Sequence, residues 1–546
     1  HAIHSEVVSG IVGRAEMFAF CFGAQALLCF ARPGLRNAGL AALLFLAAFG
    51  AKESALAWIP FALCFQLARG WQTEPGANRW AGIRRPVLVR LLAVLGAALV
   101  PYLLLRWYTF RLDAPIALAA DYSSNPLVGA PAVERVLTAT KVLGYGLWLC
   151  VAPFKLSCLY GPAVFSTVQS AGDPWLLGAA VLHLGLVAAG LALARRVPAL
   201  FLAVACFYGF AFLTSNIPLA IGTVFGERLY YTPSLGVCLG AALWWDRVGR
   251  TGRRVMLGLL TAWCAANAAM TVHRCLIWHD TCAVFKHDVE VFPESIDLQR
   301  KVAACYSIFG PEIDLPRAIR HLQEAKRIYP DFVHAYRELA DIYRKQHRYA
   351  DALAEYRASL TLHYAELPGA ESMAHMGIGD CLAAMSGRAQ GAERDRLMRE
   401  ALHSYRRILD LPQFGDSHRK AFQKLFEKAG TLLPRTELAA LYERATKVVG
   451  EDHKLAILMG VAAYRVGLPP SYVTKPMGWA FQHTPAADRT RDFWLSQLFY
   501  SDALLAEGRG ADARQLLEVL LTRPELDAAR QAEVRQQLRE DPRLRH

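Results

Sequence analysis

Residues 1–16 read HAIHSEVVSGIVGRAE, and they lead into an apolar run that ends at Ala31. About 20 apolar residues are enough to cross a bilayer as a helix. Before or within the start of this run lie His1, His4, Glu6, Arg14 and Glu16. Charged groups at the mouth of a membrane helix cost free energy. The stretch therefore predicts a membrane helix, from about Ile11 to Ala31, with a functional site at its beginning.

A regular helix through this stretch would place Glu6, Gly10 and Gly13 on one stripe, with Arg14 on its flank. Glycine residues on such a stripe would let a phosphate group or another helix approach closely. His4 or the preceding His1 could assist proton transfer near neutral pH or hold a metal ion. Nothing else in the sequence indicates a divalent metal.

The composition predicts a chain of two parts. The 546 residues are 54% hydrophobic, with a mean hydropathy of +0.21, which is high for a soluble protein and modest for a membrane protein. The long apolar runs precede Trp278, and most acidic, lysine and histidine residues follow it. We expect an all-α fold, with a polytopic membrane domain over 1–280 and a soluble helical domain over 281–546.

The net charge of +13 does not require a nucleic-acid partner. Much of the arginine excess lies in short loops between apolar runs, where the positive-inside rule places it. The 12 cysteines include no Cys-x-x-Cys pair and no zinc-ligand spacing. Those in apolar segments are expected to be buried as small hydrophobic side chains; they are Cys21, Cys29, Cys64, Cys206, Cys238 and Cys264.

The arginine-rich loops also predict the orientation of the membrane domain. These loops are 32–37, 69–86, 195–197 and 246–254. They all fall on one side if the ambiguous segment 133–151 does not cross the membrane, which leaves about seven further spans. The arginine-rich loops are then cytoplasmic. The first residues, the Lys52-Glu53 hairpin tip, the loops 106–173 and 215–228 and everything after Cys275 lie on the other side.

After Trp278 the pattern changes to a helical repeat of about 34 residues, the period of tetratricopeptide repeats (TPRs). One repeat has small and aromatic residues at Tyr336, Leu339, Ala340, Tyr343, Ala352, Tyr356 and Ser359. The repeat before it is indicated by Ala318, Leu322, Ala325 and Pro330. A third, with a loop insertion around 387–395, is suggested by Gly377, Gly379, Ala401, Tyr405 and Pro412. Such α-solenoids present a concave surface to peptides or proteins; the alternative is that the repeats only add mass or a dimer contact.

Motifs along nearly the whole chain resemble one family, the transmembrane-and-TPR-containing (TMTC-type) protein O-mannosyltransferases and their bacterial relatives. The similarity begins with His1, His4, Ser5, Glu6, Val8 and the segment Val12 to Glu16. It continues through Lys52-Glu53, Asn125-Pro126, Pro153, Leu156, Ser157, Tyr160, Glu227 to Tyr230, Pro233 to Gly236, Arg274, Trp278 and Asp280. That family is similar to GT-C glycosyltransferases, which take a sugar from a polyprenyl-phosphate donor on the non-cytoplasmic side.

The chain also departs from the pattern of that family. In the GT-C class the catalytic acid usually lies in the first outer loop, which we expect upstream of His1 in a missing N-terminal part. Ala2 stands where the family commonly has proline. Ser124 stands where an aspartate often precedes Asn-Pro, with Asp121 nearby. Asp121, Asn125 and Tyr160 are expected to shape a loop.

The resemblance implies a division of roles among the polar residues. The donor phosphate would be bound by Arg14, Lys52 and Arg228, since arginine binds phosphate through two N–H groups and lysine as a point charge. Glu6 and Glu53 are the candidate catalytic carboxylates, and His4, Glu16 and Glu227 would support them. The alternative for Arg14–Glu16, Lys52–Glu53 and Glu227–Arg228 is a set of structural ion pairs that neutralise helix ends.

Taken together, these patterns predict an integral-membrane glycosyltransferase. It would move a hexose, mannose for example, from polyprenyl phosphate to Ser/Thr hydroxyls, with the TPRs holding the acceptor protein outside the cytoplasm. The composition favours a bacterial inner membrane with periplasmic TPRs, and the alternative is the endoplasmic reticulum. A rival hypothesis is a non-enzymatic TPR scaffold or receptor anchored by its spans. A transporter would need inverted repeats or broken helices, which the sequence does not display.

Overall fold

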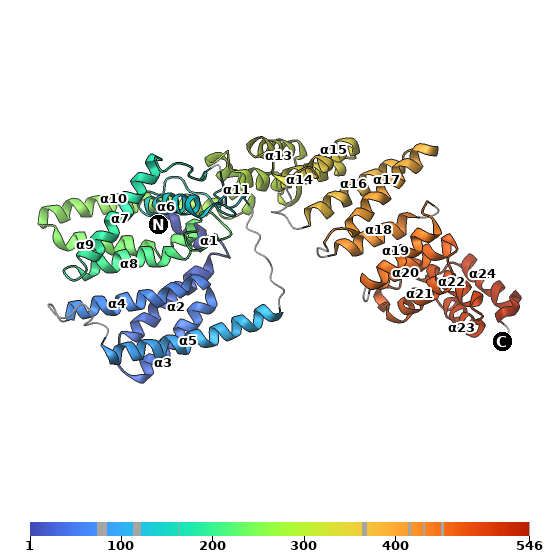
Figure 1. The fold of residues 1–546 in the computed structure, drawn as a ribbon, viewed down its shortest axis with the longest axis horizontal. Coiled ribbons are helices and arrows are strands. Elements are labelled where there is room, and N and C mark those ends of the chain that lie inside the picture. The colour runs from blue at the N-terminus through green and yellow to red at the C-terminus, as the bar shows by residue number, and fades with distance from the viewer. Residues whose placement is uncertain are drawn as a thin grey trace. The chain divides into compact units, whose positions relative to one another are not determined.

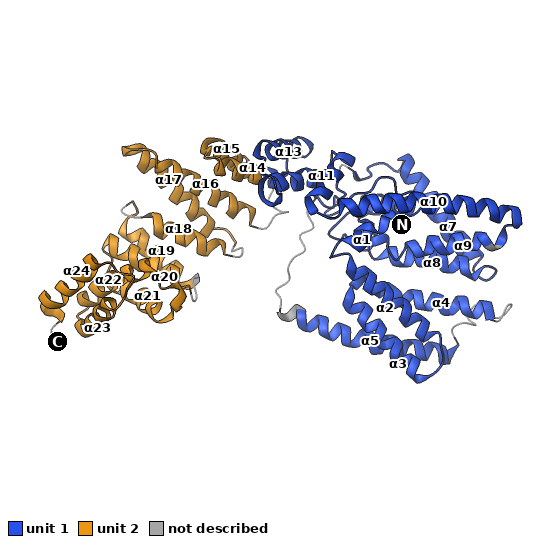
Figure 2. Ribbon diagram, turned by 180° about the vertical axis from the view of Figure 1, so that it is seen from behind, with its two compact units in different colours: residues 1–335 blue, residues 336–546 orange. Residues whose placement is uncertain are grey.

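The computed structural model describes residues 1–73, 84–112, 122–162, 164–362, 369–412, 416–429, 432–448 and 452–544. The predicted Asp121 and parts of the loops 69–86 and 106–131 lie outside these ranges. Within them every regular element is helical, which confirms the all-α prediction. The chain divides into two compact units, 1–335 and 336–546 (Figures 1 and 2).

Unit 1 holds the apolar helices and the first helices that follow them (Figure 1). Its long helices are α2 (Arg14–Phe30), α3 (Leu35–Ala51), α4 (Trp58–Thr73), α5 (Arg85–Leu112), α6 (Ala132–Leu149), α7 (Pro174–Ala192), α8 (Pro198–Phe212), α9 (Ser234–Arg247) and α10 (Arg250–Ile277). Shorter ones are η1 (Ala2–His4), α1 (Ser5–Ser9), η2 (Glu53–Ala57), η4 (Glu227–Tyr230), α11 (Thr281–Val291), α12 (Ile296–Ala304), η5 (Cys305–Phe309) and α13 (Leu315–Ile328). The predicted boundary at 280/281 falls within this unit.

Two hydrophobic clusters organise unit 1, and α8 contributes to both. One cluster packs α2 to α5 around Phe45, Phe49 and Trp58, and takes in Phe210 from α8. The other packs η1, α6 and η4 with the loop after α6, and takes in Phe207 from the adjoining face of α8. Because α8 is apolar all round, its adjoining faces can be buried in different clusters. Unit 1 thus joins the N-terminal residues to segments more than two hundred positions away.

Several helices of unit 1 are suited to a membrane, as the sequence predicts. In the part of the chain that the structure describes, three are long and apolar enough to cross one: Arg85–Thr109 within α5, α7 and α10. The bent pair Ala2–Ser9 and Arg14–Phe30 forms a fourth candidate, and Leu35–Ala51, Pro198–Phe212 and Ser234–Trp245 are shorter apolar helices. Helix α6, the ambiguous segment, is not among them. Its first turns carry Glu134 and Arg135, and Lys141 follows.

The prediction of one regular helix through residues 6–14 is wrong. The chain breaks after Ser9 and restarts at Arg14, with a bend of 102° between the two parts. The two glycines explain the break, since a Cβ on Gly13 would lie 2.6 Å from the Cα of Val7 and one on Gly10 2.7 Å from the carbonyl oxygen of Glu6. Glu6, Gly10 and Gly13 therefore do not form a helical stripe; the glycines let the chain fold back on itself.

Unit 2 is a series of helical hairpins, and its first helix, α14 (Val333–Lys345), begins at the unit boundary. It continues with α15 (Tyr349–Ser359), α16 (Ala370–Ser386), α17 (Gly391–Leu409), α18 (Ser417–Ala429), α19 (Arg435–Val448), α20 (His453–Val466), α21 (Ser471–His483), η7 (Ala486–Asp488), α22 (Arg491–Ala506), α23 (Gly510–Leu521), α24 (Ala528–Glu540) and η8 (Pro542–Leu544). This order is typical of an α-solenoid.

Small residues set the spacing between these helices, as the TPR pattern predicts. A Cβ on Gly377 would lie 2.2 Å from the ring of Tyr356, and one on Gly379 would lie 2.4 Å from the ring of Tyr405. Both tyrosines are buried, so α16 is wedged between rings that a larger residue would displace. The expected loop insertion around 387–395 is partly wrong, because α17 already begins at Gly391.

The cysteines differ from the expectation in two ways. Cys206 is buried as predicted, but Cys21, Cys238 and Cys264 are exposed on the surface of apolar helices. In addition, Cys282 and Cys305 form a disulfide between α11 and η5, although they lie 23 positions apart in the sequence. A spacing of 23 positions matches no Cys-x-x-Cys or zinc-ligand pattern, so the sequence carries no local signal for this pair.

Candidate functional site

Two ion pairs join the motif residues across unit 1. The Glu6 carboxylate pairs with Arg228, and the Glu16 carboxylate pairs with Lys52 at 2.6 Å. Both carboxylates are almost completely buried. The structure therefore brings together the first residues, the tip of the α3–α4 hairpin and the loop before α9. These three segments are the ones predicted to share one side of the membrane.

Glu6 binds Arg228 through both backbone and side chain. The amide N–H of Arg228 donates to Glu6 Oε2 at 2.9 Å, and its guanidinium pairs with Oε1. Helix η4 positions this arginine because Glu227 and Tyr230 on either side of it are buried and anchor the short helix. Side-chain exposure is 6% for Glu6 and 30% for Arg228, so the arginine can still reach a ligand in the solvent.

The Glu16–Lys52 pair lies beside a small cavity. Ser54 donates its hydroxyl to Glu16 Oε2 at 2.8 Å, which leaves Oε1 for Lys52. The cavity is lined by Glu16 and Ser54 on one side and by Leu229 and Thr232 on the other. It therefore lies next to the segment that carries Arg228. Glu53, the other residue of the hairpin tip, points away and pairs with Arg106 at 2.6 Å on the surface.

Glu227 is fully enclosed rather than exposed to a substrate. Its Oε1 accepts hydrogen bonds from the Ser157 amide at 2.6 Å and from the Tyr160 hydroxyl at 2.8 Å. Burial, together with the nearby charge of Glu6, raises the pKa of Glu227 well above its ordinary value. Its two hydrogen bonds therefore fix the loop after α6 against η4. This is a positioning role, and not that of a phosphate-binding or exposed acid.

A buried ion pair continues this network to the end of α10. Arg274 pairs with Asp288 of α11, and neither side chain is more than 4% exposed. Asp288 Oδ2 also accepts the amide N–H of Cys158 at 2.7 Å, next to the loop that holds Glu227. Burial alone would raise the pKa of Asp288, but its hydrogen bonds and the positive charge of Arg274 lower it overall. The carboxylate is thus charged and joins three segments.

The two histidines are occupied by structural hydrogen bonds. His1 donates from Nε2 to the Cys150 carbonyl at 3.0 Å, and its Nδ1 accepts from the Ile3 amide at 3.2 Å. His4 Nε2 bonds to the Ser234 hydroxyl at 3.0 Å, and that hydroxyl donates to the Tyr231 carbonyl. Among the described residues, no group of three or more His, Cys, Asp or Glu side chains is placed to hold a metal ion.

Arg14 differs from the other candidate cations. It begins α2 immediately after the bend and is exposed. Its guanidinium has no ion pair or hydrogen bond with any residue in the described part of the chain. The alternative pairs Arg14–Glu16, Lys52–Glu53 and Glu227–Arg228 do not form, since each of these acids has another partner. Arg14 is therefore the candidate cation that the protein leaves free.

The loop before α6 is tied down by residues that the sequence analysis assigned to loop shape. The side-chain amide of Asn125 donates to Asn216 Oδ1 at 2.9 Å and to the Ile221 carbonyl at 2.6 Å. Ser124, which replaces the family's aspartate, donates to Asp297 Oδ2 at 3.1 Å. A second aspartate at position 124 would repel Asp297, so this departure fits its surroundings.

An apolar groove lies beside the buried residues Tyr160 and Glu227. It has a volume of about 840 Å³ and is lined by α6, α7 and the loop between them, including Tyr145, Trp148 and Trp175. The Tyr145 ring lies 6.3 Å from that of Tyr160, which donates to Glu227. Lys155 lines the groove and is exposed, whereas Lys141 pairs with Asp173 at 2.8 Å. The groove thus combines an apolar wall with a lysine that forms no ion pair with another described residue.

Three partners of the motif residues could not be identified from the sequence. Asp288, Asp297 and Arg106 were not singled out, although each closes an ion pair or hydrogen bond to a motif residue. A signal exists for Asp288, because it lies among the buried residues Val284 and Val289 of α11, where an unpaired charge would be costly. Asp297 and Arg106 carry no comparable sequence signal, since charged residues are common near helix ends.

Comparisons with known proteins agree with the motifs. No family model matches the chain. It is 23% identical over 438 residues to the protein O-mannosyl-transferase TMTC3 of Mus musculus, covering 74% of this chain and 46% of that protein. It is 25% identical over 456 residues to Tmtc3 of Drosophila melanogaster, covering 75% and 48%. With TMTC1 of Homo sapiens it shares 26% identity over 227 residues, 38% of this chain and 24% of that protein.

The chain spans about half the length of the TMTC3 relatives that it matches. The similarity covers about three quarters of the chain itself, so it includes much more than one motif. Together with the all-α fold and the apolar helices, it supports the resemblance drawn from the polar motifs. The chain is thus similar to the TMTC-type protein O-mannosyl-transferases over about three quarters of its length.

Proposed function

We propose that this protein is a membrane-embedded protein O-glycosyltransferase that transfers a hexose, mannose in the first instance, to Ser/Thr hydroxyls. The observation that carries the proposal is that charged residues at the ends of several helices of unit 1 pair with one another. Glu16 pairs with Lys52, Glu6 pairs with Arg228, and Glu227 binds the loop that Asp288 also holds. An anchor without chemistry does not need buried charges from so many segments.

In this proposal the free cation Arg14 binds the phosphate of a polyprenyl-phosphate sugar. An arginine can donate two parallel hydrogen bonds to a phosphate, and Arg14 has no internal carboxylate to displace. Lys52 and Arg228 are each already neutralised by a glutamate. They would act by orienting Glu16 and Glu6, or by exchanging partners when a phosphate arrives.

The two candidate catalytic carboxylates are both ion-paired in this structure. Glu53 is exposed and held by Arg106, whereas Glu6 is buried and held by Arg228. Neither carboxylate is free to act as a base in this structure. We therefore assign Glu6 and Glu53 supporting roles in this step. The apolar groove between α6 and α7 is the proposed place for the lipid tail, because lipid chains need an apolar wall.

The proposal also includes sidedness. The ends of α2, α4, α9 and α10 that meet in the polar network are those predicted to face away from the cytoplasm. The disulfide between Cys282 and Cys305 supports the same side for the region after α10, since disulfides persist in oxidising compartments. The TPR unit would then hold the acceptor protein in the bacterial periplasm, or in the lumen of the endoplasmic reticulum.

The direct test is Arg14→Ala, with Arg36→Ala as the matched control. Arg36 is also an exposed arginine, but it lies beyond the other end of α2. Both variants are expressed from the complete gene, and transfer of radiolabelled mannose from polyprenyl-phosphate mannose to membrane proteins is measured. We expect at least a tenfold loss for Arg14→Ala, about the effect of one lost phosphate contact, and normal transfer for Arg36→Ala.

Membrane insertion must be equal in the two variants, which carbonate extraction and protein yield establish. If Arg14→Ala inserts normally and transfers as well as the parent, Arg14 does not bind the donor phosphate. If the parent protein itself transfers no hexose to any acceptor, the proposed activity is wrong. In that case the scaffold hypothesis, in which the repeats carry the function, takes its place.

A further inference from the structure

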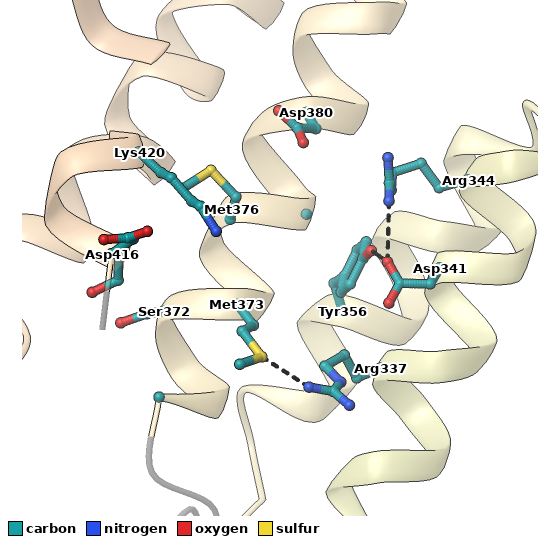
Figure 3. Close-up of a pocket in the computed structure, with 13 residues that line it drawn as sticks. Arg337, Asp341, Arg344, Tyr356, Ser372, Met373, Met376, Asp380, Asp416 and Lys420 are labelled. Carbon is teal, nitrogen blue, oxygen red and sulfur yellow. Dashed lines mark hydrogen bonds and ion pairs between the residues drawn. The ribbon is translucent and has the colours of Figure 1, made fainter. Parts of the chain in front are cut away.

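Unit 2 contains a cleft that the proposed activity does not explain (Figure 3). It has a volume of about 350 Å³ and lies among α14, α15, α16 and α18. Figure 3 shows Arg337, Asp341 and Arg344 on one side, Met373 and Met376 on α16 in the middle, and Lys420 reaching in from the other side. The cleft is therefore lined by charged residues at both edges and by flexible thioether side chains between them.

The acidic residues of the cleft are already hydrogen-bonded within the protein. Asp341 accepts from the Tyr356 hydroxyl at 2.6 Å and pairs with Arg344 at 3.3 Å. Asp380 accepts from the Tyr405 hydroxyl at 2.8 Å and pairs with Lys424 at 3.3 Å. The third, Asp416, pairs with Arg419 at 2.6 Å. Because these carboxylates already pair with residues of the repeats, few of their acceptor positions remain for a ligand.

Two basic residues remain available. Lys420 is exposed and forms no ion pair with another residue of the described chain. Arg337 contacts the Met373 sulfur at 2.8 Å, a weak acceptor, and lies 3.7 Å from Glu338. After internal pairing, the cleft thus has a surplus of donors although its formal charges nearly balance.

The two methionines define what can lie between these donors. Met373 is 41% exposed, and Met376 lines the same cleft one turn further along α16. Methionine is unbranched and polarisable, and it adapts to aliphatic side chains of different shape. A ligand that fits must therefore place an anionic group near Arg337 or Lys420 and an apolar group over the methionines. An extended peptide with alternating acidic and aliphatic residues meets both conditions.

We propose that this cleft binds an acidic, aliphatic segment of a polypeptide, with Arg337 and Lys420 pairing its Asp or Glu side chains. The inference rests on the proposed function, in which the repeats hold the acceptor protein. It adds that the repeats select which acceptor proteins bind. Acceptor proteins would be chosen by carboxylates at a distance from the Ser/Thr that receives the sugar. Binding should weaken with salt, because exposed charge pairs are screened.

The test measures binding by the full chain in detergent, without any sugar donor. The probe is a fluorescein-labelled peptide in which glutamates alternate with leucines, and the comparison peptide has glutamine in place of each glutamate. We expect the glutamate peptide to bind at least tenfold more tightly, as charge-assisted hydrogen bonds are replaced by neutral ones. Lys420→Met should lose most of that difference, and Arg337→Met likewise.

Lys447→Met is the matched control, since Lys447 is an exposed lysine of α19 outside the cleft. The charge-reversal variant Lys420→Glu shows whether a loss of binding is only a loss of structure. It should no longer bind the glutamate peptide, and it should bind more tightly a peptide in which lysines replace the glutamates. The inference is overturned if the glutamate and glutamine peptides bind equally, or if Lys420→Met behaves like Lys447→Met. Arg14→Ala should bind the peptide normally even if transfer is lost, so this test is separate from that of the proposed function.

Discussion

The enclosed carboxyl of Glu227 allows a prediction at the scale of a single residue. Because burial raises its pKa, the folded protein favours the neutral form, and the unfolded chain ionises near 4.5. The contribution of this group to stability therefore falls as the pH rises above that value. Glutamine resembles the neutral carboxyl and does not ionise. Glu227→Gln should gain stability relative to the parent between pH 5 and pH 8, measured by thermal unfolding in detergent.

The comparison variant is Glu227→Ala. It leaves the Tyr160 hydroxyl without its acceptor, whereas the Ser157 amide still donates to the Tyr160 oxygen at 3.0 Å. A buried donor left unsatisfied costs about 1–3 kcal/mol, so this variant should be clearly less stable than Glu227→Gln at every pH. The prediction fails if both variants lose the same free energy of unfolding, or if Glu227→Gln becomes less stable than the parent as the pH rises. Either result would show that the carboxyl is ionised in the folded protein.

The pair Glu6–Arg228 can be separated from its surroundings by a double-mutant cycle. Glu6→Gln and Arg228→Gln each leave a partly buried charge unpaired, whereas the double variant leaves none. We expect a coupling free energy of about 1–3 kcal/mol from chemical unfolding. The exposed pair Glu53–Arg106 is the control, and its coupling should stay below about 1 kcal/mol. Similar coupling in both pairs would mean that burial does not strengthen the Glu6–Arg228 contact.

The residue types of the site could be predicted from the sequence, but their partners could not. Charges at the ends of apolar runs identified Glu6, Glu16, Lys52 and Arg228, because such charges are costly without a purpose. Sequence neighbours were considered as partners, and the structure pairs residues 36 to 222 positions apart instead. These pairings depend on how helix ends meet in space, which local patterns do not encode.

At the scale of an element, the bend between α1 and α2 positions both Glu6 and Arg14. A Cβ on Gly13 would meet the backbone of Val7 at 2.6 Å, and a backbone cannot move aside as a flexible side chain can. Gly13→Ala should therefore open the bend, separate Glu6 from Arg228 and lower both thermal stability and hexose transfer. The control is Gly39→Ala in α3, where a Cβ meets nothing within 4 Å and the helix gains intrinsic propensity.

Stability and transfer must fall together in Gly13→Ala and remain unchanged, or improve, in Gly39→Ala. A normal Gly13→Ala protein would mean that the bend is not a required feature of the site.

The sequence predicted the existence of most helices because apolar runs and the TPR period are long-range patterns. It did not predict this bend, since Gly10 and Gly13 are equally compatible with close packing of a straight helix.

At the scale of the whole molecule, the covalent link after α10 bears on which compartment the repeats occupy. Cys282 and Cys305 close a loop of about the length for which a disulfide adds about 3 kcal/mol to the free energy of unfolding. In an oxidising compartment both thiols should resist alkylation in the denatured protein until a reductant is added. Ready alkylation of the denatured protein without reductant would place this region in a reducing compartment.

Sidedness can be tested independently by labelling introduced cysteines from outside the cell. Lys454→Cys in α20 replaces a side chain that is 65% exposed, and Arg36→Cys lies in an arginine-rich turn predicted to be cytoplasmic. In sealed spheroplasts, a membrane-impermeant maleimide should label Lys454→Cys above the parent background and should label Arg36→Cys only after permeabilisation. The opposite pattern would put the repeats and the polar helix ends in the cytoplasm. A non-cytoplasmic sugar donor could then not reach Arg14, so this labelling tests the condition on which the proposed chemistry depends.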